Sequence, residues 1–189
     1  ARGYIETVEL IRDERGSNEY EVDRLYLNDT TYTGYTGDST PRKYYNGALL
    51  PDAIGPDSGF AWNAGSQDIL DAINDGRFLV IHRDHGWESG WVKPEFLPTD
   101  ISSLLNNGNL LPVLFSVDCS TGLFDNETDT YHGVVDKQTY LLEQLIRKAN
   151  GGVVGALGDT RDSPTWANNA LTRGFADAIF PGVLPAYGG

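Results

Sequence analysis

The chain has 189 residues, of which 40% are hydrophobic, and a formal net charge of −13. This length and composition predict one globular domain with a sizeable core, to which we assign residues 1–189. Nucleic acids and anionic membranes bind basic surfaces, so the acidic charge argues against both as partners. No apolar stretch approaches the length of a membrane span. The single cysteine excludes an internal disulfide.

The N-terminal third is predicted to contain one helix, one strand and a long loop. Residues 3–14 place Ile5, Val8, Ile11 and Tyr4 on one helical face. Residues 22–27 are rich in β-formers and predict a strand, whereas residues 28–65 show no period. The chain begins inside the helical pattern and contains no methionine, so we interpret it as a fragment or a processed product.

The remainder alternates between short apolar runs and helical patterns. The apolar runs, which predict buried strands, are 78–81, 112–117 and 151–157. Helices are predicted at 67–73, from Thr99 to Leu105, at 138–149 and from Pro164 to Ile179, with Ser66, Thr99 and Ser163 as N-caps. Loops are predicted at 87–98 and 120–136. Such alternation predicts an α/β fold of three layers, with helices on both faces of a mostly parallel sheet.

Two candidate catalytic side chains follow two of these strands. His85 comes after the run 78–81, and Cys119 after the run 112–117. Because parallel strands end at one edge of the sheet, the two side chains are expected to meet there, as a thiol nucleophile and its base. Gly86 leaves room for a substrate carbonyl, and the N–H groups of Gly86 and Cys119 could form an oxyanion hole. The alternative is a buried structural cysteine and an unrelated surface histidine.

His82 and His85 form an H-x-x-H pattern, which could bind zinc if it lay on a helix. Here the pattern ends a predicted strand, where neighbours at odd separation point to opposite faces. No cysteine or third histidine lies nearby, because His132 is isolated in a predicted loop. We therefore favour a packed or hydrogen-bonded role for His82.

An acidic stretch lies in the predicted loop after the cysteine. Asp125, Glu127 and Asp129 alternate there as candidate calcium ligands. The stretch lacks the glycine turn and the distal glutamate of an EF-hand, and a solvated acidic loop is the favoured alternative. If calcium binds, it is expected to order the loop beside the cysteine and to stabilise the fold.

Residues 78–86 and 114–124 resemble the gingipain-type cysteine peptidases, which belong to the caspase-like group. In that group both catalytic residues follow adjacent strands. Residues 152–160 and 163–166 are similar to the family's next strand and to the tryptophan-bearing loop of its specificity pocket. The order of elements agrees over nearly the whole chain.

The resemblance implies a caspase-like fold and peptide hydrolysis without a required cofactor. His85 would be the general acid and base, Cys119 the nucleophile, and Gly86 with Cys119 the oxyanion hole. Trp166 would form a wall of the pocket for the residue before the cut. Trp87 and Asp162 are further candidates for substrate contacts, with loop anchoring and a surface charge as their alternatives. The expected substrate is a protein or peptide, and the expected location is secreted or at the surface of a bacterial-type cell.

The chain departs from the family pattern in three places. Asp84 stands where the family has glycine before the histidine, and Arg2 stands near the position where arginine-specific members carry an acidic residue. The family's first strand should precede the first helix, so that strand is expected to lie in a missing N-terminal segment of the same precursor, which would be a partner. Two other functions stay open: a catalytically silent peptidase-like binding module, and a thiol hydrolase that acts on a non-peptide substrate.

Overall fold

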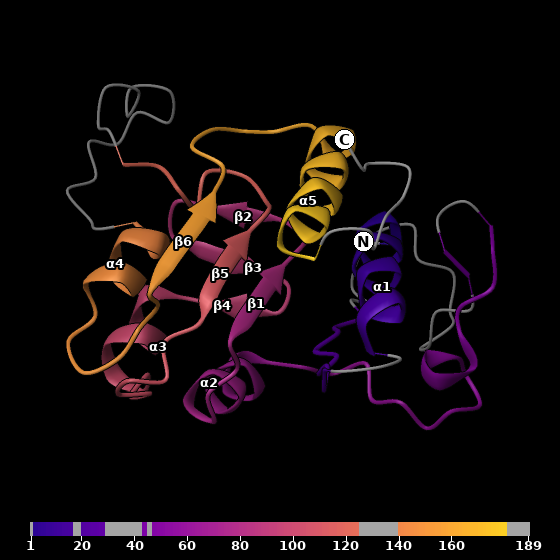
Figure 1. Cartoon of the computed structure of the whole chain (residues 1–189), viewed down its shortest axis with the longest axis horizontal. Coiled ribbons are helices and arrows are strands. Elements are labelled where there is room, and N and C mark those ends of the chain that lie inside the picture. Colours follow the sequence, from indigo (N-terminus) through magenta and orange to yellow (C-terminus); the bar gives the residue numbers. More distant parts are fainter. Residues whose placement is uncertain (1, 17–19, 29–42, 45–46, 125–139, 181–189) are drawn as a thin grey trace.

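The computed structural model describes residues 2–16, 20–28, 43–44, 47–124 and 140–180. Its central sheet is parallel and has the strand order β1-β5-β6. The three strands are β1 (Leu79–His82), β5 (Val113–Ser116) and β6 (Gly155–Gly158). Each lies within a predicted apolar run or extends one residue beyond its end, so the predicted parallel sheet is confirmed. In Figure 1 the arrowheads of the three strands point to the same edge of the molecule.

Helices cover both faces of this sheet, as predicted for a three-layer fold. Leu114 belongs to a buried cluster that includes side chains from three helices. Phe115, which points to the opposite face, lies 4.8 Å from the ring of Phe175. The helices of the first face are α2 (Ser66–Asn74), α3 (Pro98–Ser103) and α4 (Leu141–Arg147), and that of the second is α5 (Thr165–Ile179).

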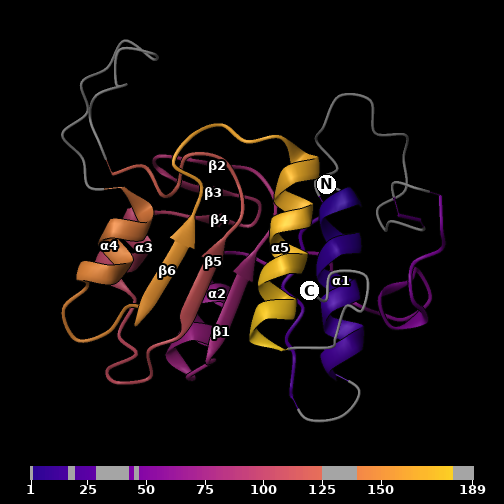
Figure 2. The same cartoon turned by 45° about the horizontal axis from the view of Figure 1, so that its top comes forward.

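Helix α1 (Arg2–Gly16) lies beside α5, and its N-terminal end is on the side of the strand arrowheads (Figures 1 and 2). Glu9 of α1 is only 1% exposed. Its carboxylate accepts hydrogen bonds from the Arg24 guanidinium at 2.8 and 3.0 Å and from the Tyr26 hydroxyl at 2.5 Å. These hydrogen bonds to the Glu9 carboxylate join α1 to the segment that follows it. None of the described helices is long and apolar enough to cross a membrane.

The prediction of a strand at residues 22–27 is wrong. The structure has only an isolated bridge there, between Leu27 and Asn63. The β-formers of this segment pack by their side chains: Tyr26 lies 5.5 Å from Trp62 in a second apolar cluster. A short 3-10 helix (Asp52–Ile54) belongs to the same region.

The prediction of a loop at residues 87–98 is also wrong, because this segment forms a small antiparallel sheet. Its strands are β2 (Gly86–Trp87), β3 (Gly90–Val92) and β4 (Glu95–Phe96), in sequential order. Each has two or three residues, too few for an alternating pattern to be visible. Trp91 and Phe96 are buried and join the main core, which explains why this sheet forms.

The predicted N-caps are wrong at all three helices. The caps are Gly65, Leu97 and Pro164, and none of them makes a side-chain cap bond. In α2 and α3 an acidic residue of the first turn accepts the N–H of the cap residue instead. Asp68 accepts the Gly65 N–H at 2.8 Å, and Asp100 accepts the Leu97 N–H at 2.8 Å.

Candidate active site

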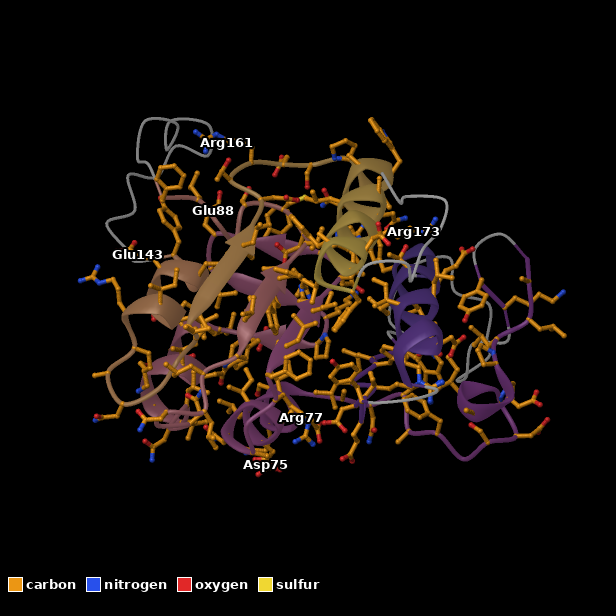
Figure 3. The ribbon with its side chains drawn as sticks, in the orientation of Figure 1. Asp75, Arg77, Glu88, Glu143, Arg161 and Arg173 are labelled. Carbon is orange, nitrogen blue, oxygen red and sulfur yellow. The ribbon has the colours of Figure 1, made fainter. Side chains whose placement is uncertain are left out.

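The register of the parallel sheet brings His85 and Cys119 to the same edge. His82 pairs with Ser116 at the ends of β1 and β5. His85 and Cys119 each follow three residues after that pair. The imidazole is exposed and the thiol is partly buried. In Figure 3 the labelled Glu88 and Arg161 mark this edge, and Asp75 and Arg77 mark the opposite one.

The turn after β5 is held against the loop after β6. Ser120, directly after the cysteine, has φ 59°, a left-handed conformation that a non-glycine residue rarely adopts. Its N–H donates to Arg161 O at 3.3 Å, and Gly122 N–H donates to Asp159 O at 3.0 Å. The Cys119 thiol lies 3.8 Å from Ser163 O. A strained backbone beside a partly exposed thiol is typical of a functional turn.

Asp118, the residue before the cysteine, is the centre of a buried polar network. Its carboxylate is hydrogen-bonded to His82 Nδ1 at 2.8 Å, and it accepts bonds from the hydroxyls of Ser116 at 2.9 Å and Thr121 at 2.5 Å. Trp91 Nε1 donates to Ser116 Oγ at 2.7 Å, and its ring stacks on His82 at 4.2 Å. The predicted hydrogen-bonded role of His82 is therefore confirmed. The network holds the ends of β1 and β5 together beneath the candidate nucleophile.

Gly86 lies directly over this network. A Cβ at position 86 would be 2.6 Å from Asp118 Cγ and 2.8 Å from Thr121 Cγ2, closer than real contacts allow. The glycine therefore lets the backbone after His85 approach the Asp118 carboxylate.

Tyr4 of α1 and Arg83 surround His85 from the other side. The Tyr4 hydroxyl lies 3.4 Å from His85 Nε2, and the Arg83 guanidinium lies 4.2 Å from the centre of the Tyr4 ring. Burial lowers the pKa of Arg83, against the opposing effect of the nearby Tyr4 and Asp84. Asp84, the departure from the family pattern, accepts the His85 N–H at 2.7 Å. Tyr4 is 81 residues from His85 in sequence, and the sequence analysis did not identify this contact.

A second acidic group lies beneath the loop after β6. The Asp159 carboxylate accepts hydrogen bonds from the Ser163 hydroxyl and from the Asn168 amide, the latter at 2.7 Å. Burial raises the pKa of Asp159 above the ordinary value, although the bonds from Ser163 and Asn168 oppose the shift. Ser163, expected to cap α5, thus joins this loop to the turn that carries Cys119, because its hydroxyl also donates to Asp118 O at 3.0 Å.

The remaining candidate residues lie at the surface or outside the described part. Trp166 is 76% exposed and Trp87 is 51% exposed. Asp162 is exposed and accepts a hydrogen bond from Ser120 Oγ at 3.4 Å. The candidate calcium ligands Asp125, Glu127 and Asp129, and also His132, fall outside the described residues. Among the residues that are described, no group of three or more His, Cys, Asp or Glu could hold a metal ion.

A parallel sheet between helices, with a histidine and a cysteine after neighbouring strands, is the arrangement of caspase-like cysteine peptidases. The chain belongs to peptidase family C25, whose family model matches residues 4–186. The gingipain-type resemblance and the caspase-like fold are confirmed by this match and by two solved structures.

The first of these structures is the Arg-specific cysteine proteinase gingipain R, which matches with a TM-score of 0.53 and a sequence identity of 25%. The match covers 61% of this chain and 25% of the gingipain chain. The second is a complex of the pro- and mature domains of RgpB from Porphyromonas gingivalis, with a TM-score of 0.51 and 24% identity over 61% of this chain and 26% of that chain. The present chain thus covers only about a quarter of each of those chains. No curated protein sequence matches it.

Proposed function

We propose that the chain carries the catalytic pair of a cysteine endopeptidase, with Cys119 as nucleophile and His85 as general acid and base. The observation that carries the proposal is the register, in which both residues stand three positions beyond the paired ends of β1 and β5. Membership of peptidase family C25 supports the reaction class. His85 and Cys119 also lie at the carboxyl edge of the parallel sheet, and this is the edge at which open α/β sheets bind their ligands.

In the proposed reaction the Cys119 thiolate attacks the scissile carbonyl and forms a tetrahedral intermediate. His85 takes the thiol proton and gives it to the leaving amine, which leaves an acyl-enzyme. A water molecule, deprotonated by His85, then hydrolyses the thioester and restores the thiol. The chemistry requires no cofactor.

The backbone N–H groups of Gly86 and Cys119 are the proposed oxyanion hole. Val92 N–H donates to His85 O at 3.0 Å, so the next pair of this ladder, Gly86 with Trp91, is of the non-hydrogen-bonded kind. The Gly86 N–H therefore points away from β3. An N–H that the ladder does not use is available to a developing oxyanion.

The exposed side chains around the pair suggest how a peptide would bind. Trp166 is the proposed wall of the specificity pocket, and Trp87 and Asp162 are proposed substrate contacts. By analogy with the solved complex of pro- and mature domains, a segment of the same precursor is the proposed protein partner. We further propose a secreted or cell-surface location of bacterial type, as expected from the gingipain resemblance.

The test is alkylation by iodoacetamide near pH 6, read as intact mass, on the native chain and on His85→Ala. Cys119 is the only cysteine, so the mass reports on this thiol alone. An ordinary thiol is barely ionised at this pH, so fast labelling that slows sharply in His85→Ala would support the pair. Cys119→Ala should then abolish peptide cleavage while the circular dichroism spectrum stays native. Equal, slow labelling of both chains would refute the pair and favour a silent binding module.

A further inference from the structure

Among the described residues, Tyr4 is the side chain from another element that contacts the His85 imidazole. Its hydroxyl lies 3.4 Å from Nε2, and the two rings meet edge to face, with centroids 5.5 Å apart and planes at 85°. His85 is exposed, whereas Tyr4 is only 7% exposed. A buried phenol thus holds one edge of an imidazole that otherwise faces solvent.

The phenol is itself held in place by groups from both sides of the site. The buried Arg83 guanidinium lies 4.2 Å from the centre of the Tyr4 ring. Arg83 donates to Val117 O at 3.1 Å, two residues before Cys119, and to Thr165 O at 3.0 Å at the start of α5. The Tyr4 hydroxyl also lies 3.5 Å from Thr165 Oγ1. Tyr4 therefore contacts the turn after β1 and the start of α5, and Arg83, which lies over its ring, links both to the residue that follows β5.

The chemistry of the pair assigns a role to each ring nitrogen. A phenol oxygen can accept the Nε2–H, both in the neutral tautomer whose lone pair is on Nδ1 and in the imidazolium. Nδ1 is then the ring nitrogen whose lone pair can take up a proton. In hydrolases with a catalytic histidine, a third group commonly orients the imidazole in this way.

We propose that Tyr4 is a positioning residue for His85: its hydroxyl accepts the Nε2–H and so aims Nδ1 at the Cys119 thiol. This inference rests on the proposed function, because it assigns to His85 the role of acid and base. The other titratable groups beside His85 are Arg83 behind the Tyr4 ring, Asp84, which accepts the backbone N–H, and Cys119 on the neighbouring turn. Neither Asp84 nor Arg83 forms a hydrogen bond to the imidazole among the described contacts.

The test is Tyr4→Phe, which removes one oxygen and keeps the ring that packs on His85 and Arg83. The matched control is Tyr20→Phe, because Tyr20 packs on Phe78 at the opposite end of β1. We expect kcat to fall about fivefold in Tyr4→Phe, the factor that one net hydrogen bond is worth, with KM unchanged. In alkaline solution the imidazole ¹⁵N signals of His85, assigned by their loss in His85→Ala, should shift away from those of the Nε2–H tautomer, because the ring has lost the acceptor that favours this tautomer. Tyr20→Phe should change neither measurement.

The outcomes separate this inference from the proposed function. Unchanged imidazole ¹⁵N signals of His85 in Tyr4→Phe would overturn the inference even if the native chain cleaves peptides. A raised KM with an unchanged kcat would also overturn it, since Tyr4 would then contact substrate rather than position His85. Imidazole ¹⁵N signals that move as expected in a chain without peptidase activity would support the Tyr4–His85 contact and refute the proposed function.

Discussion

Gly86→Ala tests whether the network beneath the site positions the proposed catalytic pair. The added Cβ would lie 2.6 Å from Asp118 Cγ, 2.7 Å from Asp118 Oδ2 and 2.8 Å from Thr121 Cγ2. Ordinary contact requires these atoms to retreat by about 1 Å. Both neighbours are buried and hydrogen-bonded to each other at 2.5 Å, so neither side chain can rotate away without breaking that bond.

The expected loss has two parts. Overpacking of a rigid site costs about 1–3 kcal/mol of unfolding free energy, which leaves a domain of ordinary stability folded. Activity should suffer more, because Asp118 directly precedes Cys119 and Gly86 directly follows His85. A displacement of about 1 Å between reacting groups costs on the order of 100-fold in kcat/KM.

The assays are urea unfolding, iodoacetamide labelling and peptide cleavage, with Gly155→Ala as the matched control. Gly155 also lies in a strand of the described structure, but a Cβ there would have nothing within 4 Å. Gly155→Ala should therefore leave labelling and cleavage unchanged. Native-like stability and activity in Gly86→Ala would refute the close approach of Gly86 to Asp118 and its role in the site.

Three further predictions concern stability. Glu9→Gln should lower the unfolding free energy measured in urea by about 3 kcal/mol, because it leaves the partly buried Arg24 charge without its partner. The control is Glu143→Gln in the exposed pair with Arg147, which should change the unfolding free energy by less than about 1 kcal/mol. Similar losses in both variants would contradict this account. Because burial raises the pKa of Asp159, the folded state binds this proton more tightly than the unfolded chain, so its stabilisation is present at low pH and lost as pH rises through the raised pKa. Asp159→Asn should therefore gain stability relative to the native chain across that pH range in urea titrations, and a constant difference would count against the shift. If Asp125, Glu127 and Asp129 bind calcium, the alternative to a solvated acidic loop, EDTA should lower the Tm and Asp125→Ala should reproduce the effect, whereas an unchanged Tm would leave the solvated loop.

The parallel sheet, and the edge at which His85 and Cys119 lie, could be predicted because their signals are local. Each strand of that sheet is a short apolar run between turn residues, and parallel pairing sends all carboxyl ends to one edge. The positions of His85 and Cys119 follow from this geometry alone. The small sheet of β2, β3 and β4 could not be predicted, because its strands are too short to show a period and form by packing Trp91 and Phe96 on the core.

The contacts that support the site are invisible in the sequence because they join distant segments. Asp118 and His82 are 36 residues apart, and Tyr4 and His85 are 81 apart. Each of these side chains has a common alternative role at the surface or in the core, so no spacing distinguishes them. The prediction of a strand at residues 22–27 is wrong for a related reason. The β-forming side chains of this segment are used in tertiary packing, and its Arg24 binds the buried Glu9.

The buried groups beneath the site explain how an exposed histidine and a partly exposed cysteine can have a defined geometry. Asp118 connects the end of β1 to the turn after β5, and Arg83 connects both to the start of α5. Partly satisfied polar networks are costly, so strand ends joined by several buried hydrogen bonds have one favoured arrangement. His82 Nε2 is one of the few buried polar atoms of the described residues without a hydrogen-bond partner, and the stacking of its ring on Trp91 holds it there. The relative position of His85 and Cys119 is therefore determined by buried contacts between three elements, and substitutions in those contacts should alter activity before they unfold the domain.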